Sequence, residues 1–376
     1  MVPVAAAAGG YDTGETDWDF LFQNQGAVAI EAATRYFNPQ RDLTNITGAL
    51  GPSIDVDETA PFMVQRYSIA ARLGESVRCM GSYRQPWAGE ADYGSAWTYS
   101  FSAITQSFTS EDFGLTCGVS MALEKGKLTL LGGVSRQEVN YVLTQTTPIV
   151  GGTTTTDVSD EATAYRIGLA YEIPEYAMRF SVIYNSQVDY DMTGTVAFSA
   201  TPAPATPVFG SISMPQSVEA KFQSGVAPGW LVFGSAKWTD WSVADNMPLC
   251  AVGTPVCTQA AALSGLTLLF KDTWTVTLGA AHQFNEYFSV AGNVTWDQGA
   301  TQGFTSQTDT WVAGLTAVLT PAQGMELKFG GTAGIMTSGN LSTLTLPGGI
   351  ANPFGYTASF GDDLVYTVDA SAVFRF

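Results

Sequence analysis

The sequence predicts an all-β chain that crosses a membrane as an antiparallel β-barrel of about 14 strands, with a short N-terminal plug segment. Three observations lead to this fold class. Charged residues make up 13% of the 376-residue chain, whereas soluble domains average about a quarter. No stretch approaches the roughly 18 consecutive apolar residues of a spanning helix. Apolar side chains alternate with polar or small ones along most of the chain, as they do in β-strands.

If this chain enters a membrane, its strands must close on themselves, because only a closed barrel leaves no lipid-exposed backbone group unpaired. In residues 165–173 the odd-numbered side chains are aromatic or aliphatic, and the even-numbered ones are polar or small. The same alternation recurs in residues 273–280 and 310–319. Long side chains outside and small or hydroxyl side chains inside suit a barrel whose interior admits a solute.

The connections between the alternating segments are short and long in turn. Short turns are predicted at Leu73–Ser76, Glu124–Lys127, Pro174–Ala177, Val226–Gly229, Gln283–Glu286 and Thr320–Gly324. Longer linkers are predicted at Trp87–Phe108, Thr146–Ser159, Ser199–Ser213, Ala244–Leu269, Gly299–Ser306 and Asn340–Gly355. Outer-membrane barrels arrange periplasmic turns and extracellular loops in this way, and the scheme gives about fourteen strands, an even number.

The two ends of the chain add to this interpretation. Apolar side chains alternate over residues 364–376, and a last strand that ends on Phe376 resembles the signal read by outer-membrane assembly machinery. The alanines at 5–8 resemble the small-residue end of a signal peptide, and a disordered tail accounts for them equally well. We divide the chain into an N-terminal tail with a reduced hatch segment, residues 1–25, and a barrel, residues 26–376.

The charge of the chain restricts its partners. The net charge of −18 argues against nucleic acid. The negative charge does not exclude contact with anionic lipopolysaccharide, because divalent cations can bridge loop carboxylates to it. We therefore expect outer-membrane lipid and lipopolysaccharide around the chain. We also expect a monomer. His282 is the only histidine, and no cysteine spacing completes a zinc pattern with it, so we expect no metal and no cofactor.

The four cysteines form two natural pairs that suit disulfides in an oxidising compartment. Cys250 and Cys257 lie seven positions apart inside the longest linker, where a bridge would restrain the loop. Cys79 and Cys117 flank the Trp87–Phe108 linker, so they face each other if the flanking strands pair. We favour the loop bridge, since few barrels cross-link lipid-facing neighbours.

Several segments resemble the FadL/TodX family of outer-membrane transporters. Residues 9–22 resemble the start of many alphaproteobacterial members, and residues 33–39 (Ala-Thr-Arg-Tyr-Phe-Asn-Pro) resemble the end of the family's first strand. Residues 166–177 resemble a recurrent strand-turn-strand segment. Residues 214–242 contain the family's Pro…Glu…Trp-Ser stretch, and residues 270–274 match its Phe-Lys-Asp-x-aromatic stretch. Together these segments cover nearly the whole chain outside the long loops.

The resemblance implies a fourteen-strand barrel, a small N-terminal hatch on the periplasmic side and a lateral exit through a kinked third strand. This chain departs from the better-known members at the hatch. Only about 25 residues precede its first alternating strand, and the family's Asn-Pro-Ala segment is absent. How the lumen is plugged is therefore an open question for the structure.

Lys271 is the first candidate for binding the carboxylate head group of a fatty acid. It directly follows the long linker that ends near Leu269, and it matches the lysine that the family associates with ligand binding. A buried head group needs a cation that is not already neutralised. The alternative is an ion pair between Lys271 and the neighbouring Asp272.

Arg136 is the second candidate, because it resembles a basic residue near the outer end of the family's fifth strand. Strict alternation from Leu128 and Leu130 directs it toward lipid, and a bulge at Gly132-Gly133 would turn it into the lumen. The alternative is a side chain that reaches the lipopolysaccharide boundary.

Three other basic residues are weaker candidates: Arg84, Arg166 and Lys237. Arg166 and Lys237 also suit ion pairs with luminal carboxylates such as Glu172.

The sequence favours passive uptake of hydrophobic small molecules over the other function classes. An enzyme of the serine-histidine type would need His282, which lies beside a predicted periplasmic turn, and the chain has no Gly-x-Ser-x-Gly elbow. We therefore expect no catalytic residue. Long-chain fatty acids are the first expected ligand, captured at extracellular loops and released by a lateral or luminal path. Aromatic hydrocarbon uptake, a general diffusion porin and an adhesive barrel are the alternatives.

Overall fold

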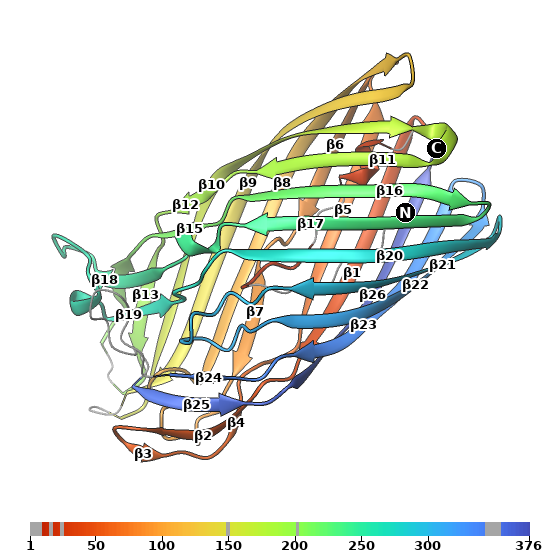
Figure 1. Cartoon of the computed structure of the whole chain (residues 1–376). Coiled ribbons are helices and arrows are strands. Elements are labelled where there is room, and N and C mark those ends of the chain that lie inside the picture. Colours follow the sequence, from red (N-terminus) through yellow and green to blue (C-terminus); the bar gives the residue numbers. More distant parts are fainter. Residues whose placement is uncertain (1–9, 15–17, 23–25, 148–150, 201–202, 343–354) are drawn as a thin grey trace.

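Fourteen long strands alternate in direction and close into a barrel (Figure 1). The computed structural model describes residues 10–14, 18–22, 26–147, 151–200, 203–342 and 355–376. The barrel strands are β1 (Val28–Pro39), β5 (Phe62–Arg72), β6 (Val77–Arg84), β8 (Thr105–Leu123), β9 (Gly126–Thr146), β10 (Thr153–Ile173), β11 (Met178–Asn185), β16 (Ser217–Ala227), β17 (Trp230–Thr239), β20 (Thr273–Asn285), β21 (Phe288–Asp297), β22 (Thr310–Ala322), β23 (Met325–Met336) and β26 (Asp363–Arg375). The first and last strands pair along their length, from Ala29 opposite Arg375 to Pro39 opposite Val365.

The outer face is apolar, as the alternation predicts. Ile167, Leu278 and Leu315 keep 57%, 68% and 64% of their surface exposed, although they are large aliphatic residues. Their sequence neighbours point inward and are buried or half-buried. Exposed apolar residues on most strands of a closed sheet are the arrangement that hydrocarbon requires. The predicted fold class is confirmed.

The six predicted short turns lie at one end of the barrel, and the longer segments lie at the other (Figure 1). Short turns are periplasmic in outer-membrane barrels, so the looped end is extracellular. The smaller strands belong to that end: β2 (Asp42–Gly48), β3 (Gly51–Pro52), β4 (Val56–Asp57), β12 (Val188–Tyr190), β13 (Thr193–Phe198), β14 (Thr206–Phe209), β15 (Ile212–Met214), β18 (Asn246–Ala251), β19 (Ser264–Thr267), β24 (Gly339–Leu341) and β25 (Tyr356–Phe360). Single 3-10 turns lie at Pro174–Tyr176, Trp241–Val243 and Gln259–Ala261.

Several connections differ from the prediction in their bounds. The linker placed at Thr146–Ser159 is shorter, because β9 continues to Thr146 and β10 already begins at Thr153. Residues 40–61 form an extracellular loop that is not among the predicted linkers.

The third strand is interrupted. β6 ends at Arg84, and β7 (Ala88–Asp92) continues in the same direction along β8. Arg84 lies opposite Asp112 and Ala88 lies opposite Thr109, so four steps along the third strand match three along β8. The extra residue makes a bulge, which bends a strand and disrupts its pairing. The kinked third strand implied by the family resemblance is therefore present, and it centres on residues 85–87.

An N-terminal segment fills part of the lumen. The short helix α1 (Asp19–Phe22) buries Phe20, Leu21 and Phe22, and Trp18 just before it is also buried. These side chains pack against inward-facing residues such as Ala70 and Ile183. No helix in the described part of the chain is long and apolar enough to cross a membrane. The division at residue 25 stays a prediction.

Candidate functional site

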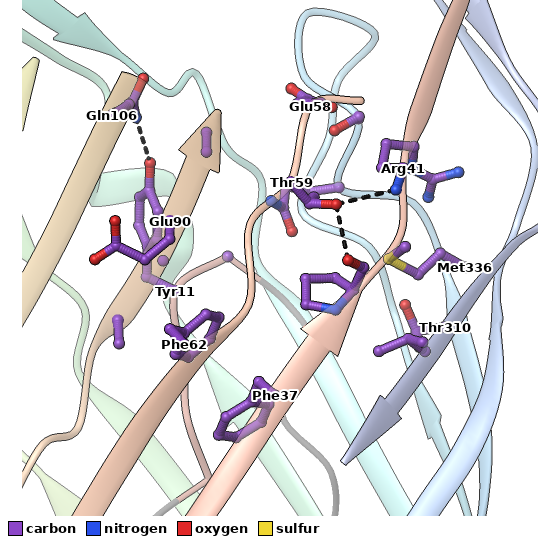
Figure 2. Close-up of a pocket in the computed structure, with 18 of the residues that line it drawn as sticks. Tyr11, Phe37, Arg41, Glu58, Thr59, Phe62, Glu90, Gln106, Thr310 and Met336 are labelled. Carbon is purple, nitrogen blue, oxygen red and sulfur yellow. Dashed lines mark hydrogen bonds between the residues drawn. The ribbon is translucent and has the colours of Figure 1, made fainter. Parts of the chain in front are cut away.

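A cavity of about 170 Å³ lies where the extracellular ends of β1, β5, β22, β23 and β26 meet the extracellular loops. Figure 2 shows aromatic, aliphatic and hydroxyl side chains converging on it from several strands. Its apolar lining includes Tyr11, Phe37, Phe62, Tyr93, Met336 and Val365. A concave, mostly apolar site with a few polar groups is the usual form of a small-molecule site.

Arg41 is the main cation at the cavity, and protein groups already surround it. Its guanidinium donates to the Asp363 carboxylate at 2.8 Å, to the Thr308 hydroxyl at 3.0 Å and to the Gly361 carbonyl oxygen at 3.0 Å. It also lies 4.5 Å from the centre of the Phe360 ring. Because Arg41 is buried, these contacts replace water around its charge. They also join three extracellular segments over the cavity.

Acidic groups outnumber cations around the cavity. Asp12, Glu58 and Glu90 line it, and Arg41 is the single basic residue among the lining side chains. Burial raises the pKa of Glu58, and its carboxylate accepts a hydrogen bond from the Tyr93 hydroxyl at 2.9 Å. This electrostatic environment is unfavourable for a ligand carboxylate.

The floor of the cavity comes from the N-terminal segment. The Tyr11 ring stacks on Phe108 with 4.7 Å between ring centres, and its hydroxyl accepts a hydrogen bond from the Gln106 amide at 3.0 Å. A Cβ atom at Gly89 of β7 would lie 2.5 Å from the Tyr11 ring. Gly89 therefore permits the N-terminal segment to pack directly against the interrupted third strand.

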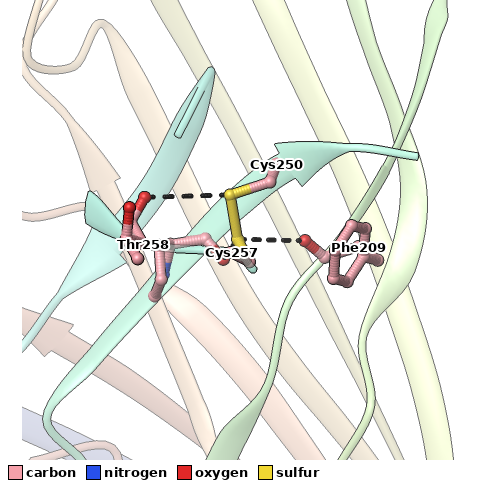
Figure 3. Close-up of a disulfide and its surroundings, with 5 residues drawn as sticks. Phe209, Cys250, Cys257 and Thr258 are labelled. Atoms are coloured by element: carbon pink, nitrogen blue, oxygen red, sulfur yellow. Dashed lines mark hydrogen bonds between the residues drawn. A yellow bond between two sulfur atoms is a disulfide. The ribbon is translucent and has the colours of Figure 1, made fainter. Parts of the chain in front are cut away.

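Disulfides join both predicted cysteine pairs. The Cys250–Cys257 bridge closes the tip of the loop after β18, and its sulfur atoms lie near the carbonyl oxygens of Phe209 and Thr258 (Figure 3). Cys79 and Cys117 lie directly opposite each other on β6 and β8. Alternation turns this second pair to the outer face. The favoured loop bridge is present, and the strand pair is bridged as well, because the register places Cys79 and Cys117 directly opposite each other.

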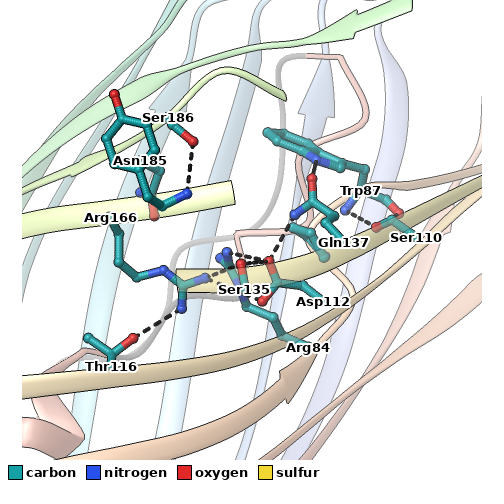
Figure 4. A network of polar contacts seen from close by, with 12 residues as sticks. Arg84, Trp87, Ser110, Asp112, Thr116, Ser135, Gln137, Arg166, Asn185 and Ser186 are labelled. Atoms are coloured by element: carbon teal, nitrogen blue, oxygen red, sulfur yellow. Dashed lines mark hydrogen bonds and ion pairs between the residues drawn. The ribbon is translucent and has the colours of Figure 1, made fainter. Parts of the chain in front are cut away.

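Arg84 and Arg166 hold the N-terminal segment. Both form ion pairs with the buried Asp112, at 3.1 Å and 3.4 Å, and Figure 4 shows the side chains of both arginines extending to that carboxylate. Both also lie against the Trp18 ring, at 5.3 Å and 4.5 Å from its centre. These weaker candidates therefore fix the segment in the lumen and are not available as isolated cations.

Lys237 has a similar role higher in the barrel. Its ammonium pairs with the carboxylate of Asp12 in the N-terminal segment. The partner suggested from the sequence, Glu172, instead pairs with Lys127 and Arg179 at the periplasmic end. Thus Arg166 and Lys237 do pair with luminal carboxylates, although with different ones.

Lys271 lies beside the extracellular apolar core. Its neighbour Phe270 is buried in that core and packs edge-on against Trp241. Lys271 itself is half-buried, and no ion pair involves it in the described part of the chain. Asp272 accepts a hydrogen bond from the Ser242 backbone instead. Lys271 does not line the cavity, so its role in ligand binding stays a prediction.

Arg136 does not reach the lumen, and this part of the prediction is wrong for the structure. Its side chain is 68% exposed on the outer face and pairs with Glu161 on β10. The pairing of β9 with both neighbours is regular through Gly132 and Gly133, so no bulge reverses the alternation. Arg136 instead marks the level where the apolar outer face gives way to charged residues.

Sequence reasoning missed Arg41 and Tyr11. Arg41 lies in the unrecognised loop 40–61, and its partners Thr308 and Asp363 are more than 260 positions away. Composition was the available signal. The chain has only 16 Lys and Arg residues, so each basic residue can be considered as a luminal or loop residue.

Comparison with known proteins identifies the family. The family model for outer membrane protein transport protein (OMPP1/FadL/TodX) matches residues 109–310, more than half of the chain. The chain belongs to this family. It is therefore an outer-membrane barrel of a family that transports hydrophobic compounds, and members of that family are transporters and not enzymes. No curated protein matches the sequence.

Three solved structures share the fold. A FadL homologue from Pseudomonas aeruginosa is 12% identical, with a TM-score of 0.77 over 95% of this chain and 91% of that one. The toluene transporter TodX from P. putida is 13% identical, with a TM-score of 0.66 over 99% of both chains. The toluene transporter TbuX from Ralstonia pickettii is 13% identical, with a TM-score of 0.67 over 98% and 96%.

Proposed function

We propose that the chain admits small uncharged hydrophobic molecules, with single-ring aromatic hydrocarbons as the substrate class. The observation that carries this proposal is the cavity of about 170 Å³ beneath the extracellular loops. An apolar cavity of about 150 Å³ binds benzene in an engineered protein. A long-chain fatty acid is too large for this volume, so its tail would have to extend beyond the cavity.

The charge distribution supports a neutral ligand. Asp12 is neutralised by Lys237 and Arg41 by Asp363, which leaves Glu58 and Glu90 as the remaining carboxyl groups of the lining. A carboxylate that enters must be desolvated beside these two acids without a free cation. An aromatic hydrocarbon needs no such partner and gains from contact with Phe37 and Phe62.

The route out of the cavity is proposed to be lateral. The strand β7 contributes Ala88–Ala91 to the cavity wall, directly beside the interruption at residues 85–87. Below the cavity the lumen is filled by the N-terminal segment. A hydrophobic solute that leaves through the interrupted wall enters lipid without crossing the charged periplasmic half.

Long-chain fatty acids are the second candidate, and Lys271 favours them. This lysine has no ion pair among the described residues and lies next to the extracellular apolar core. A head group at Lys271 would leave the tail to follow that core toward the cavity.

Uptake by proteoliposomes tests the proposal, with toluene and oleate as the two substrates. We expect toluene uptake by the parent chain and its loss in Ala91→Phe, because Ala91 points into the cavity beside Gln106 and a phenyl group fills the space. Ala372→Phe is the matched control, since Ala372 lies on the lipid-facing side of β26. Uptake of oleate but not of toluene by the parent chain would reverse the order of the two candidates.

A further inference from the structure

The interrupted strand has an unusual set of backbone partners. Regular pairing between β5 and β6 ends at Arg66 opposite Arg84. The next residue pair in that register would be Gln65 with Gln85, but these two residues are no longer paired as strand neighbours. Backbone groups in a membrane wall need partners from the protein, because hydrocarbon supplies none. The hydrogen-bond partners of residues 85–88 therefore show what keeps this part of the third strand apart from β5.

The N-terminal segment supplies most of these partners. The Thr13 hydroxyl donates to the Gln85 carbonyl oxygen at 2.8 Å, and the Thr13 N–H donates to the Pro86 carbonyl oxygen at 3.1 Å. The Ala88 N–H donates to the Tyr11 carbonyl oxygen at 2.9 Å. Asp12 lies opposite Trp87 as in an antiparallel ladder. Residues 11–13 thus pair with the third strand from the inside.

The remaining groups are also satisfied without β5. The Trp87 N–H donates to the Ser110 hydroxyl, and that hydroxyl donates to the Trp87 carbonyl oxygen, both at 2.8 Å. Pro86 has no N–H to satisfy. Every backbone N–H and carbonyl oxygen from Pro86 to Trp87, together with the Gln85 oxygen and the Ala88 N–H, therefore has a partner inside the barrel.

On the outer side, a side chain replaces a backbone bond. The Gln65 N–H donates to the side-chain oxygen of Gln85 at 2.8 Å, and the Tyr67 hydroxyl donates to the side-chain oxygen of Gln65 at 2.9 Å. In an unbroken sheet the Gln65 N–H would reach the backbone oxygen of Gln85, which Thr13 occupies here. Thr13 therefore engages, from the luminal side, the acceptor that β5 would use in an unbroken sheet.

We propose that residues Tyr11–Thr13 hold open the interruption of the wall at residues 85–87, because they replace β5 as the hydrogen-bonding partner of the third strand. This inference rests on the lateral route proposed above. When the segment withdraws, the carbonyl oxygens of Gln85 and Pro86 and the N–H of Ala88 lose their partners. Re-pairing with β5 restores at least the first of these bonds and closes the wall. The segment is then a positioning element for the exit as well as a filler of the lumen.

Thr13→Pro tests this proposal, because proline removes both the N–H and the hydroxyl of Thr13. Toluene uptake by proteoliposomes and ionic conductance in a planar bilayer are measured on the same preparations. We expect uptake to fall at least about fivefold, the change that one net hydrogen bond supports, while conductance stays equal or rises. Thr13→Ser keeps both donors and serves as the matched control with parental uptake.

Cross-linking measures directly whether β5 and the third strand pair at residues 65 and 85. Cysteines at positions 65 and 85 lie opposite each other once the strands pair, at a Cα separation that suits a disulfide. The double variant Gln65→Cys/Gln85→Cys should oxidise faster with proline at position 13 than with threonine. Toluene uptake by Thr13→Pro at or above that of Thr13→Ser overturns the proposal, and so does reduced uptake without faster cross-linking. If the parent chain takes up neither toluene nor oleate, the proposed function fails instead.

Discussion

The two halves of the lumen differ in chemistry. The extracellular half is an apolar core in which Phe108, Trp241 and Phe270 pack with residues from the loops. The periplasmic half is charged, with ion pairs between neighbouring strands and between strand and plug. These pairs are Arg66–Glu31, Lys127–Glu172, Arg179–Asp19, Arg179–Glu172 and Arg375–Glu326.

The two halves suit two different roles, the entry of a hydrophobic solute and the anchoring of the N-terminal segment. An apolar extracellular half favours a hydrophobic solute over water, since the solute gains by leaving water. A charged periplasmic half holds the N-terminal segment by specific partners, and a hydrocarbon gains nothing from entering it. Under the proposed function, the charged half acts as a barrier that directs the solute to the side, and the apolar half acts as the site of capture.

The largest effect is expected from Trp18→Ala in the charged half. Truncating a buried tryptophan costs about 3–5 kcal/mol, and two guanidiniums lose the ring they lie against. We expect the segment to detach and the barrel to show steady ionic conductance in a planar bilayer. Trp311→Ala is the matched control, because Trp311 is 49% exposed on the outer face. Conductance equal to that of the control would contradict the role of Trp18 as an anchor.

The outer wall followed from the sequence because lipid imposes one rule on every strand. The prediction for residues 165–173 required only alternation, and Tyr165, Ile167 and Leu169 do face outward at 50%, 57% and 40% exposure. The same rule already directed Arg136 outward, and the structure agrees with the simple alternation rather than with the proposed bulge. A bulge is present, but it lies in the third strand at residues 85–87.

The lumen did not follow from the sequence, because its contacts join distant positions with no shared periodicity. Glu172 was the example given of a luminal carboxylate that could pair with Arg166, whereas Arg166 pairs with Asp112, two strands away on the inner face of the barrel. The contacts of Arg41 depend on how three extracellular loops fold together, and no periodicity within one loop predicts that arrangement. Family resemblance supplied the kinked third strand, and no residue pattern in the chain indicated that the N-terminal segment pairs with it.

Lys271→Ala tests whether the apolar half also binds a charged head group. If its ammonium receives a head group, the variant loses about 1.5–3 kcal/mol of oleate binding, roughly tenfold to a hundredfold in affinity. Toluene binding should be almost unchanged, because toluene has no charge to pair. Lys271→Arg should restore only part of the affinity, since a planar guanidinium places its charge differently. Both ligands can be measured by equilibrium binding to detergent-purified protein.

Equal losses for oleate and toluene in Lys271→Ala would mean that the substitution damages the apolar core next to Phe270. Anomalous migration of the unheated protein on a detergent gel verifies that the barrel is intact in each variant. Unchanged oleate binding would remove Lys271 from the site and leave the neutral-ligand proposal as the better account.

The smallest effect is expected from Arg41→Met, which loosens the cover of the cavity and replaces one polar side chain of its lining with an apolar one. Methionine fills similar space but breaks the contacts with Asp363, Thr308 and Gly361, so the extracellular segments lose their common tie. We expect toluene uptake to become faster by a few fold, about the effect of one or two net hydrogen bonds. Arg41→Lys keeps the charge beside Asp363, so its rate of toluene uptake should lie between those of the parent chain and Arg41→Met. If uptake by Arg41→Met equals that of the parent chain while its loops become more sensitive to protease, the cover does not limit admission to the cavity.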